Sequence, residues 1–140
     1  MNFAEIEVGR KFEVGPVTID REKAVAFARE YDPLPIHWDE EHARGTRFGG
    51  LVAPGVMCFM TAWAQFIRQN PVGDNLIAGK STKIEWLAPI RPGDRIRGDI
   101  VVTDKVRRNP YNGIVVITCD FYNQDGEHVM RDVTEAVVAG

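Results

Sequence analysis

Several features that would assign this chain to a common functional class are missing from its sequence. No apolar stretch is long enough to cross a lipid bilayer, and residues 1–7 lack the basic and apolar regions of a signal peptide. The net charge is −3, whereas proteins that bind nucleic acids are usually basic. We therefore expect a cytoplasmic protein that binds neither nucleic acid nor membrane.

Cysteine and histidine are scarce, and neither is clustered. Cys58 and Cys119 lie in apolar stretches without the CxxC spacing of zinc or redox sites, and only three histidines are present. This pattern favours free thiols in a reducing compartment over a disulfide or zinc framework. We expect no metal site.

The first half of the chain has helical periodicity. Its 140 residues contain no repeat, low-complexity tract or linker, so we expect one domain over residues 1–140. Residues 11–19 alternate loosely and predict a short strand. Residues 21–31 follow the N-cap candidate Asp20 and predict an amphipathic helix, which the following prolines end. Residues 54–69 are apolar around nearly the whole circumference of a helix, so we expect this second helix to be buried.

The second half changes to the period of β-strands. Long segments that often alternate and are rich in β-branched residues predict four strands, which we interpret as an antiparallel meander. They cover residues 76–87, 94–107, 114–123 and 129–139. The order of elements places the protein in the α+β class. Because such a sheet has free edges, we predict a homodimer.

Asp32 and His37 stand five residues apart, with Pro33 and Pro35 between them. In an extended turn stiffened by proline, the two side chains can converge on one cavity. A carboxylate and an imidazole together can bind a water molecule, take a proton from it and return one elsewhere. For this spacing alone, an exposed acid beside a histidine that satisfies a turn is the more common arrangement.

The start of the apolar helix is a second candidate. The first turn of a helix has unpaired amides and the positive end of the dipole, which suit an oxygen that gains negative charge. Pro54, expected at the first helical position, has no amide, so the first donors are Gly55 and Val56. Gly55 has no side chain to obstruct a ligand.

Together these two segments identify a family. Residues 31–39 (YDPLPIHWD) and 48–57 (FGGLVAPGVM) resemble the MaoC-like dehydratases, which include the R-specific enoyl-CoA hydratases, and residues 84–94 (IEWLAPIRPGD) are similar to a later signature of that family. The resemblance spans residues 8–138. It implies a hotdog fold, in which an antiparallel β-sheet wraps around a central buried α-helix.

The resemblance also implies an activity and its residues. The reaction is the addition of water to a trans-2-enoyl-CoA to give a 3-hydroxyacyl-CoA, or its reverse. Asp32 is the implied base, His37 orients the water and shares in proton transfer, and the backbone at Gly55 binds the thioester carbonyl. Coenzyme A is part of the substrate, so we expect no separate cofactor. The expected substrate-binding residues are Phe48, Gly55, Val56 and Met57.

The chain departs from the hydratases at two positions. They commonly carry asparagine where this chain has Leu34, and histidine where it has Pro54. These differences favour a non-catalytic acyl-CoA-binding subunit as one alternative. A hotdog thioesterase is another, although residues 54–69 lack the acid that those enzymes usually place on the central helix. Residues 80–108 carry eight Lys or Arg against four acids, which suits the phosphates of coenzyme A, although solvated strand faces are the more frequent explanation of such a bias.

Overall fold

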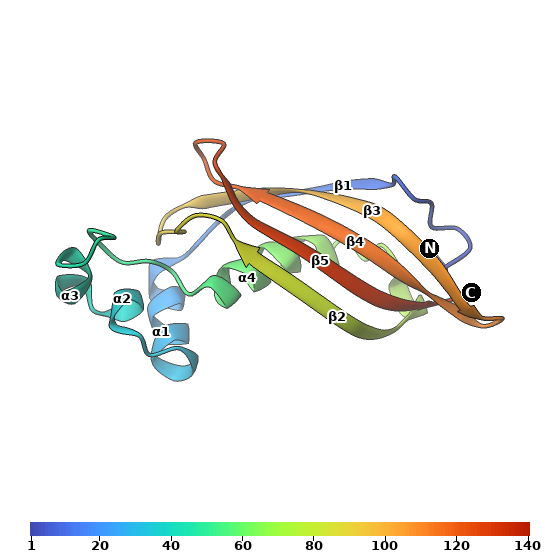
Figure 1. Cartoon of the computed structure of the whole chain (residues 1–140), viewed down its shortest axis with the longest axis horizontal. Helices are drawn as coiled ribbons and strands as arrows, with labels where there is room; N and C mark the ends of the chain where they lie inside the picture. Colours follow the sequence, from blue (N-terminus) through green and yellow to red (C-terminus); the bar gives the residue numbers. More distant parts are fainter.

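One antiparallel sheet curves around one long helix in the computed structural model, which describes residues 1–140 (Figure 1). The strands are β1 (Lys11–Thr18), β2 (Leu76–Trp86), β3 (Arg95–Asn109), β4 (Asn112–Tyr122) and β5 (His128–Ala139). The helices are α1 (Arg21–Tyr31), α2 (Pro35–Trp38), α3 (Glu40–Arg44) and α4 (Gly55–Ile67), and a short 3-10 helix covers Gly73–Asn75. This is the hotdog arrangement that the resemblance implies. None of the helices combines the length and the apolar composition needed to span a bilayer.

The order of strands differs from the predicted four-strand meander. β3, β4 and β5 are consecutive neighbours, but β2 pairs with β5 and β1 pairs with β3, which gives the order β1-β3-β4-β5-β2. The prediction was wrong because alternation reports which face of a strand is buried and says nothing of its neighbour. β4 and β5 therefore lie between β2 and β3 in the sheet, although residues 87–94 connect these two strands directly in the chain.

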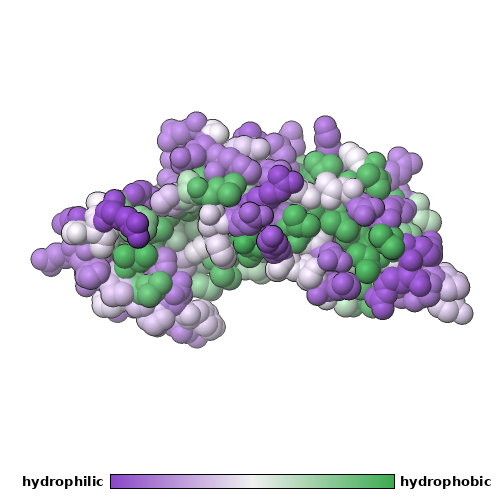
Figure 2. Space-filling model, viewed as in Figure 1, coloured by the Kyte–Doolittle hydropathy of each residue, from purple (hydrophilic) through white to green (hydrophobic).

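α4 is buried on one side only. Met57, Cys58 and Phe59 are buried, and the Phe59 ring lies edge-on to Phe121 of β4 with 6.3 Å between ring centroids. Met60, on the opposite side, is about half exposed, as are Val56 and Ile67. The expectation of a helix buried all round was wrong because a single sheet covers one side of it. Apolar surface is visible among the polar side chains in Figure 2.

Both cysteines are free thiols inside the core, as expected. Burial, reinforced by the negative charge of Asp94, raises the pKa of the Cys58 thiol to about 12. Burial also raises the pKa of Cys119. Neither thiol is therefore ionised near neutral pH.

Part of the basic segment holds the two ends of the chain. The Lys105 ammonium donates to the carbonyls of Phe3 and Ile6, each at 2.7 Å. The Arg107 guanidinium donates to the Gly140 carbonyl at 2.7 Å. These two cations stabilise the fold, so the basic bias of residues 80–108 is in part structural.

Asp132 of β5 is a fully buried carboxyl on the inner face of the sheet. The Thr82 and Thr134 hydroxyls donate to its two oxygens, the second at 2.5 Å. Burial raises its pKa above the ordinary 3.8, although both hydroxyls act in the opposite direction. The folded protein therefore retains this proton at pH values where the unfolded chain has lost it.

This shift predicts a pH-dependent loss of stability. The contribution of Asp132 to the free energy of unfolding is fully present below about pH 4 and is lost as the pH rises through the raised folded pKa. Asp132→Asn cannot ionise, so we expect its stability relative to the wild type to increase as the pH rises from about 4 through the raised folded pKa. Urea unfolding of both proteins across this range measures the difference. A difference that is constant with pH would contradict the assignment.

Candidate active site

The end of α1 positions Asp32. The helix begins at Asp20, whose carboxylate accepts a hydrogen bond from the Lys23 amide at 2.9 Å, as its N-cap role predicts. It ends at Asp32, whose amide still donates to the Ala28 carbonyl at 2.9 Å. Pro33 follows and does not fit a continuing helix. The Asp32 side chain is therefore attached to a fixed helix end, and it remains 41% exposed.

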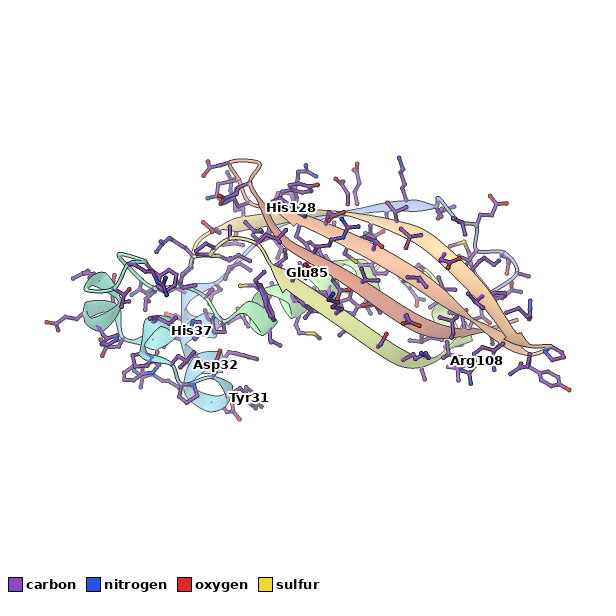
Figure 3. The ribbon with its side chains drawn as sticks, in the orientation of Figure 1. Tyr31, Asp32, His37, Glu85, Arg108 and His128 are labelled. Carbon is purple, nitrogen blue, oxygen red and sulfur yellow. The ribbon has the colours of Figure 1, made fainter.

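A single helical turn positions His37. The segment was predicted to be extended, but Pro35 occupies the first turn of α2 and only Leu34 before it is extended. Proline is favoured at the start of a helix because no N–H is needed there. The turn brings the His37 Nε2 atom to 3.2 Å from Asp32 Oδ2 (Figure 3). The side chains converge as expected, and their catalytic role stays a proposal.

The backbone of Leu34 connects the two residues. Its amide donates to the Asp32 carbonyl at 2.8 Å, and its own carbonyl accepts from the His37 amide at 2.9 Å. The Leu34 side chain is 53% exposed and does not line the cavity beside the pair. The departure from asparagine at this position therefore leaves the geometry of the pair intact.

The His37 ring makes a hydrogen bond through Nδ1 and faces Asp32 through Nε2. The ring is 7% exposed, and its Nδ1 atom lies 2.6 Å from the Val52 carbonyl. Because a carbonyl only accepts, Nδ1 carries a hydrogen. Nε2 lies 3.2 Å from Asp32 Oδ2, a separation at which the two groups form an ion pair when the imidazole is protonated. A carboxylate and an imidazole placed in this way can take a proton from a third group or give one to it.

Arg91 holds the loop that supplies the Val52 carbonyl. Its guanidinium donates to the carbonyls of Phe48 at 2.6 Å and Leu51 at 3.4 Å. The Val52 amide in turn donates to the Ile36 carbonyl at 3.0 Å. Arg91 thus positions His37 through the loop. In the sequence Arg91 is one of eight basic residues in 80–108, and no local pattern there indicates this role.

Loss of this anchor is expected to destabilise the protein. In Arg91→Met two carbonyls lose a charged donor, so the free energy of unfolding should fall by about 1–3 kcal/mol. Arg95→Met is the matched control, because the exposed Arg95 bonds only through its backbone amide. It should change stability by less than about 0.5 kcal/mol. Urea unfolding compares them, and equal stability of the two variants would refute the role of Arg91.

Asp32 and His37 open into a cavity of about 250 Å³. Gly55 and Val56 at the start of α4 line the same cavity, and so does Trp86 at the end of β2. The remaining wall is apolar and comes from the loop before α4 and the segment after β2. The cavity therefore combines a proton-exchanging pair with a mostly apolar enclosure.

The start of α4 leaves its first amides free. Pro54 is the N-cap and not the first helical residue, so the helix begins one residue later than predicted. Pro54 makes no side-chain capping bond. The first backbone bond runs from the Cys58 amide to the Pro54 carbonyl at 3.1 Å. The amides of Gly55, Val56 and Met57 have no acceptor within the chain. In Figure 1 this start is the end of α4 that lies nearer to α1 and α2.

Two expected binding residues lie outside the cavity. Met57 is buried in the core, and Phe48 lies in the loop that Arg91 holds. Neither lines the cavity, so their roles in substrate binding stay predictions.

His128, which has no partner evident in the sequence, contacts Asp120 at 2.9 Å, whereas His42 is exposed.

Comparisons with known proteins agree with this fold. Residues 7–132 match the family described as FAS1-like, dehydratase domain region. The chain is similar to a MaoC-like dehydratase from Rhodospirillum rubrum, with a TM-score of 0.90, 32% identity, and coverage of 99% of this chain and 97% of that one. It is also similar to the R-hydratase PhaJ1 of Pseudomonas aeruginosa, with a TM-score of 0.78, 26% identity, and coverage of 99% and 84%. The uncharacterized protein YdeM of Bacillus subtilis is 29% identical over 125 residues, which are 89% of each chain.

Proposed function

The chain belongs to the MaoC-like dehydratases and matches the FAS1-like dehydratase region, and from this premise we propose that it hydrates an enoyl thioester or catalyses the reverse dehydration. One observation carries the proposal. The Asp32–His37 pair, 3.2 Å apart, shares a cavity with the free amides of Gly55 and Val56. This combination offers both the proton exchange and the charge stabilisation that the reaction needs. We propose coenzyme A as the carrier of the acyl group.

The dyad accounts for the proton that the water loses and for the proton that the α-carbon gains. The Asp32 carboxylate takes one proton while the water oxygen bonds to the β-carbon of the substrate. The electrons of the double bond move towards the thioester carbonyl, and the α-carbon then takes a proton from His37 Nε2. The proton on Asp32 crosses the 3.2 Å contact to Nε2 and restores the pair. Water is thus added as a β-hydroxyl and an α-hydrogen.

The start of α4 supplies the complementary charge. The carbonyl oxygen becomes enolate-like as water adds, and free amides at a helix N-terminus stabilise such an oxygen. Gly55 and Val56 supply these amides within the cavity. Removing one such donor costs about two to three orders of magnitude in rate in enzymes that use it.

Thioester hydrolysis is the second candidate. Asp32 is the only carboxylate that lines the cavity, and α4 carries no acid. Hydrolysis would therefore need Asp32 as well, without the separate acid on the helix. The observed pairing of this carboxylate with a buried histidine favours hydration.

A direct assay separates these functions. Crotonyl-CoA and longer or branched enoyl-CoAs are followed for loss of the enoyl absorbance, with thiol release measured in parallel. We expect loss of absorbance without thiol release. Thiol release without hydration would establish a thioesterase, and binding without either reaction would establish a non-catalytic subunit.

We also propose the homodimer. β2 is an edge strand, and nearly all of its residues are exposed. Its apolar residues Leu76 and Ile77 are about half exposed, as is Met60 on the neighbouring open side of α4. An unpaired edge with apolar residues favours pairing with a second copy.

A further inference from the structure

Trp86 forms one wall of the cavity beside the dyad. It is the last residue of β2 and pairs with Met130 of β5, so the sheet edge fixes its backbone. Its indole ring lies against Gly55. The Cε2 and Nε1 atoms are each 2.5 Å from the point that a Cβ atom of residue 55 would occupy. The edge of the ring that bears the N–H thus occupies the space that a side chain at position 55 would fill.

The N–H of this ring is without a partner. The Trp38 indole, in contrast, donates from Nε1 to the Pro33 carbonyl at 3.0 Å, whereas the Trp86 Nε1 atom has no acceptor in the chain. Trp86 is 47% exposed, and the concave surface that it lines contains Asp32, His37 and the free Gly55 amide. Because this N–H has no acceptor in the chain and its ring lines the cavity, it is free to donate to an acceptor on a ligand.

We propose that the Trp86 N–H is a second hydrogen-bond donor, with the Gly55 amide, to the carbonyl oxygen of the thioester. The inference rests on the proposed function and adds a catalytic residue to it. One donor belongs to the helix backbone and the other to a side chain of the sheet edge, and contact between them keeps both beside one oxygen. Trp86 only donates a hydrogen bond, and it exchanges no proton and forms no covalent bond with the substrate.

The role predicts which kinetic constant changes. The carbonyl oxygen gains negative charge as water adds, so a donor to it binds the transition state more strongly than the substrate. Its removal therefore lowers kcat and leaves KM nearly unchanged. If the Trp86 ring only encloses the site, replacing it with phenylalanine should leave kcat unchanged.

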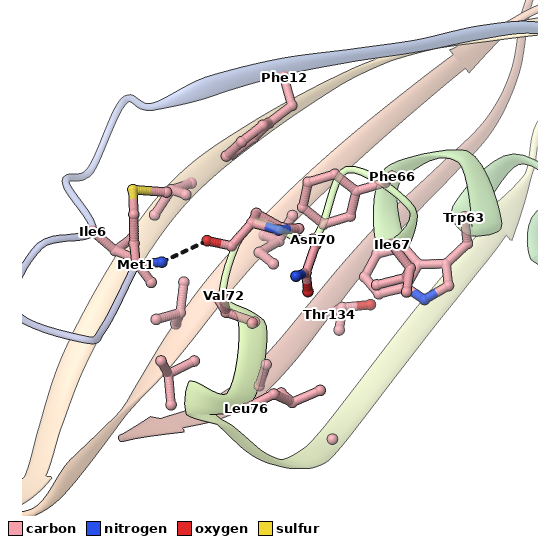
Figure 4. Close-up of a pocket in the computed structure, with 18 residues that line it drawn as sticks. Met1, Ile6, Phe12, Trp63, Phe66, Ile67, Asn70, Val72, Leu76 and Thr134 are labelled. Carbon is pink, nitrogen blue, oxygen red and sulfur yellow. Dashed lines mark hydrogen bonds between the residues drawn. The ribbon is translucent and has the colours of Figure 1, made fainter. Parts of the chain in front are cut away.

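Trp86→Phe is the test, because it retains an aromatic ring against Gly55 and removes the N–H. We expect kcat for crotonyl-CoA hydration to fall by about a hundredfold. KM should stay within about threefold. Trp63→Phe is the matched control, since Trp63 lines a separate apolar cavity of about 280 Å³ near the far end of α4 (Figure 4). A Trp86→Phe variant with the wild-type kcat would overturn the proposal.

A binding measurement tests the donor without turnover. In wild-type protein labelled with nitrogen isotope at tryptophan, the Trp86 indole resonance should move downfield when butyryl-CoA binds. It should not move downfield with S-butyl-CoA, a thioether that lacks the carbonyl. An indole resonance that responds equally to both compounds overturns the role of Trp86, whatever the activity. Absence of hydration by the wild type refutes the proposed function instead, and the carbonyl-specific shift then still reports the donor.

Discussion

His37→Ala is expected to lower kcat for enoyl-thioester hydration by about two to four orders of magnitude, the range that a positioned acid–base group contributes. The substitution removes the nitrogen that we propose gives a proton to the α-carbon, and it leaves the Val52 carbonyl without its partner. Asp32→Asn should have a loss of similar size, because an amide cannot accept a proton from water. Steady-state kinetics with crotonyl-CoA measure both.

The two losses should not add. Because Asp32 and His37 act as one unit in the proposed mechanism, the double variant should be about as slow as the slower single variant. His42→Ala is the matched control, because this histidine is exposed on α3 and should leave kcat unchanged. Full hydratase activity in both single variants would assign the chemistry to other residues.

Gly55→Ala is expected to inactivate the site by disturbing the helix start and the Trp86 ring. A Cβ atom at this position would lie 2.5 Å from the Trp86 ring, closer than any stable contact, so the ring or the helix start must move. Either movement separates the donors at Gly55 and Trp86, and kcat should fall by about a hundredfold or more. Overpacking should also lower the free energy of unfolding by about 1–3 kcal/mol. Kinetics and urea unfolding measure the two effects.

Two further variants identify the cause. Gly45→Ala is the control, because Gly45 has an ordinary helical conformation and its nearest neighbour to an added Cβ lies at 3.5 Å. The double variant Gly55→Ala/Trp86→Ala removes the obstructing ring. It should recover stability without recovering kcat, since the indole donor is absent. Wild-type kcat in Gly55→Ala would show that the Trp86 ring and the helix start need not stay in contact.

The helices whose ends are marked by residues close in sequence were predicted well. The helix over residues 21–31 has the predicted bounds, because Asp20 caps its start and Pro33 follows its end. α4 differs by one residue at its start and two at its end, where fraying makes boundaries imprecise. The neighbour of β2 was predicted wrongly, since strand pairing depends on contacts between residues far apart in the chain.

The residues of the site that are close in sequence were predicted, and those that are distant in sequence were not. Asp32 and His37 are close in sequence, and their prolines indicated a turn, so convergence was predictable even though α2 was not. Arg91 and Trp86 act on residues about thirty to forty positions earlier in the chain. Their roles depend on how β2 and the loop after it lie against α4, and no local pattern reports that arrangement.

The fate of the water oxygen tests the central claim most directly. The protein is incubated with crotonyl-CoA in water enriched in heavy oxygen, and the intact thioester and the free acid are analysed by mass spectrometry. Hydration by the Asp32–His37 pair predicts one heavy oxygen in the acyl part of an intact 3-hydroxyacyl-CoA, in the wild type and not in His37→Ala. Heavy oxygen found only in a released carboxylic acid would contradict this account.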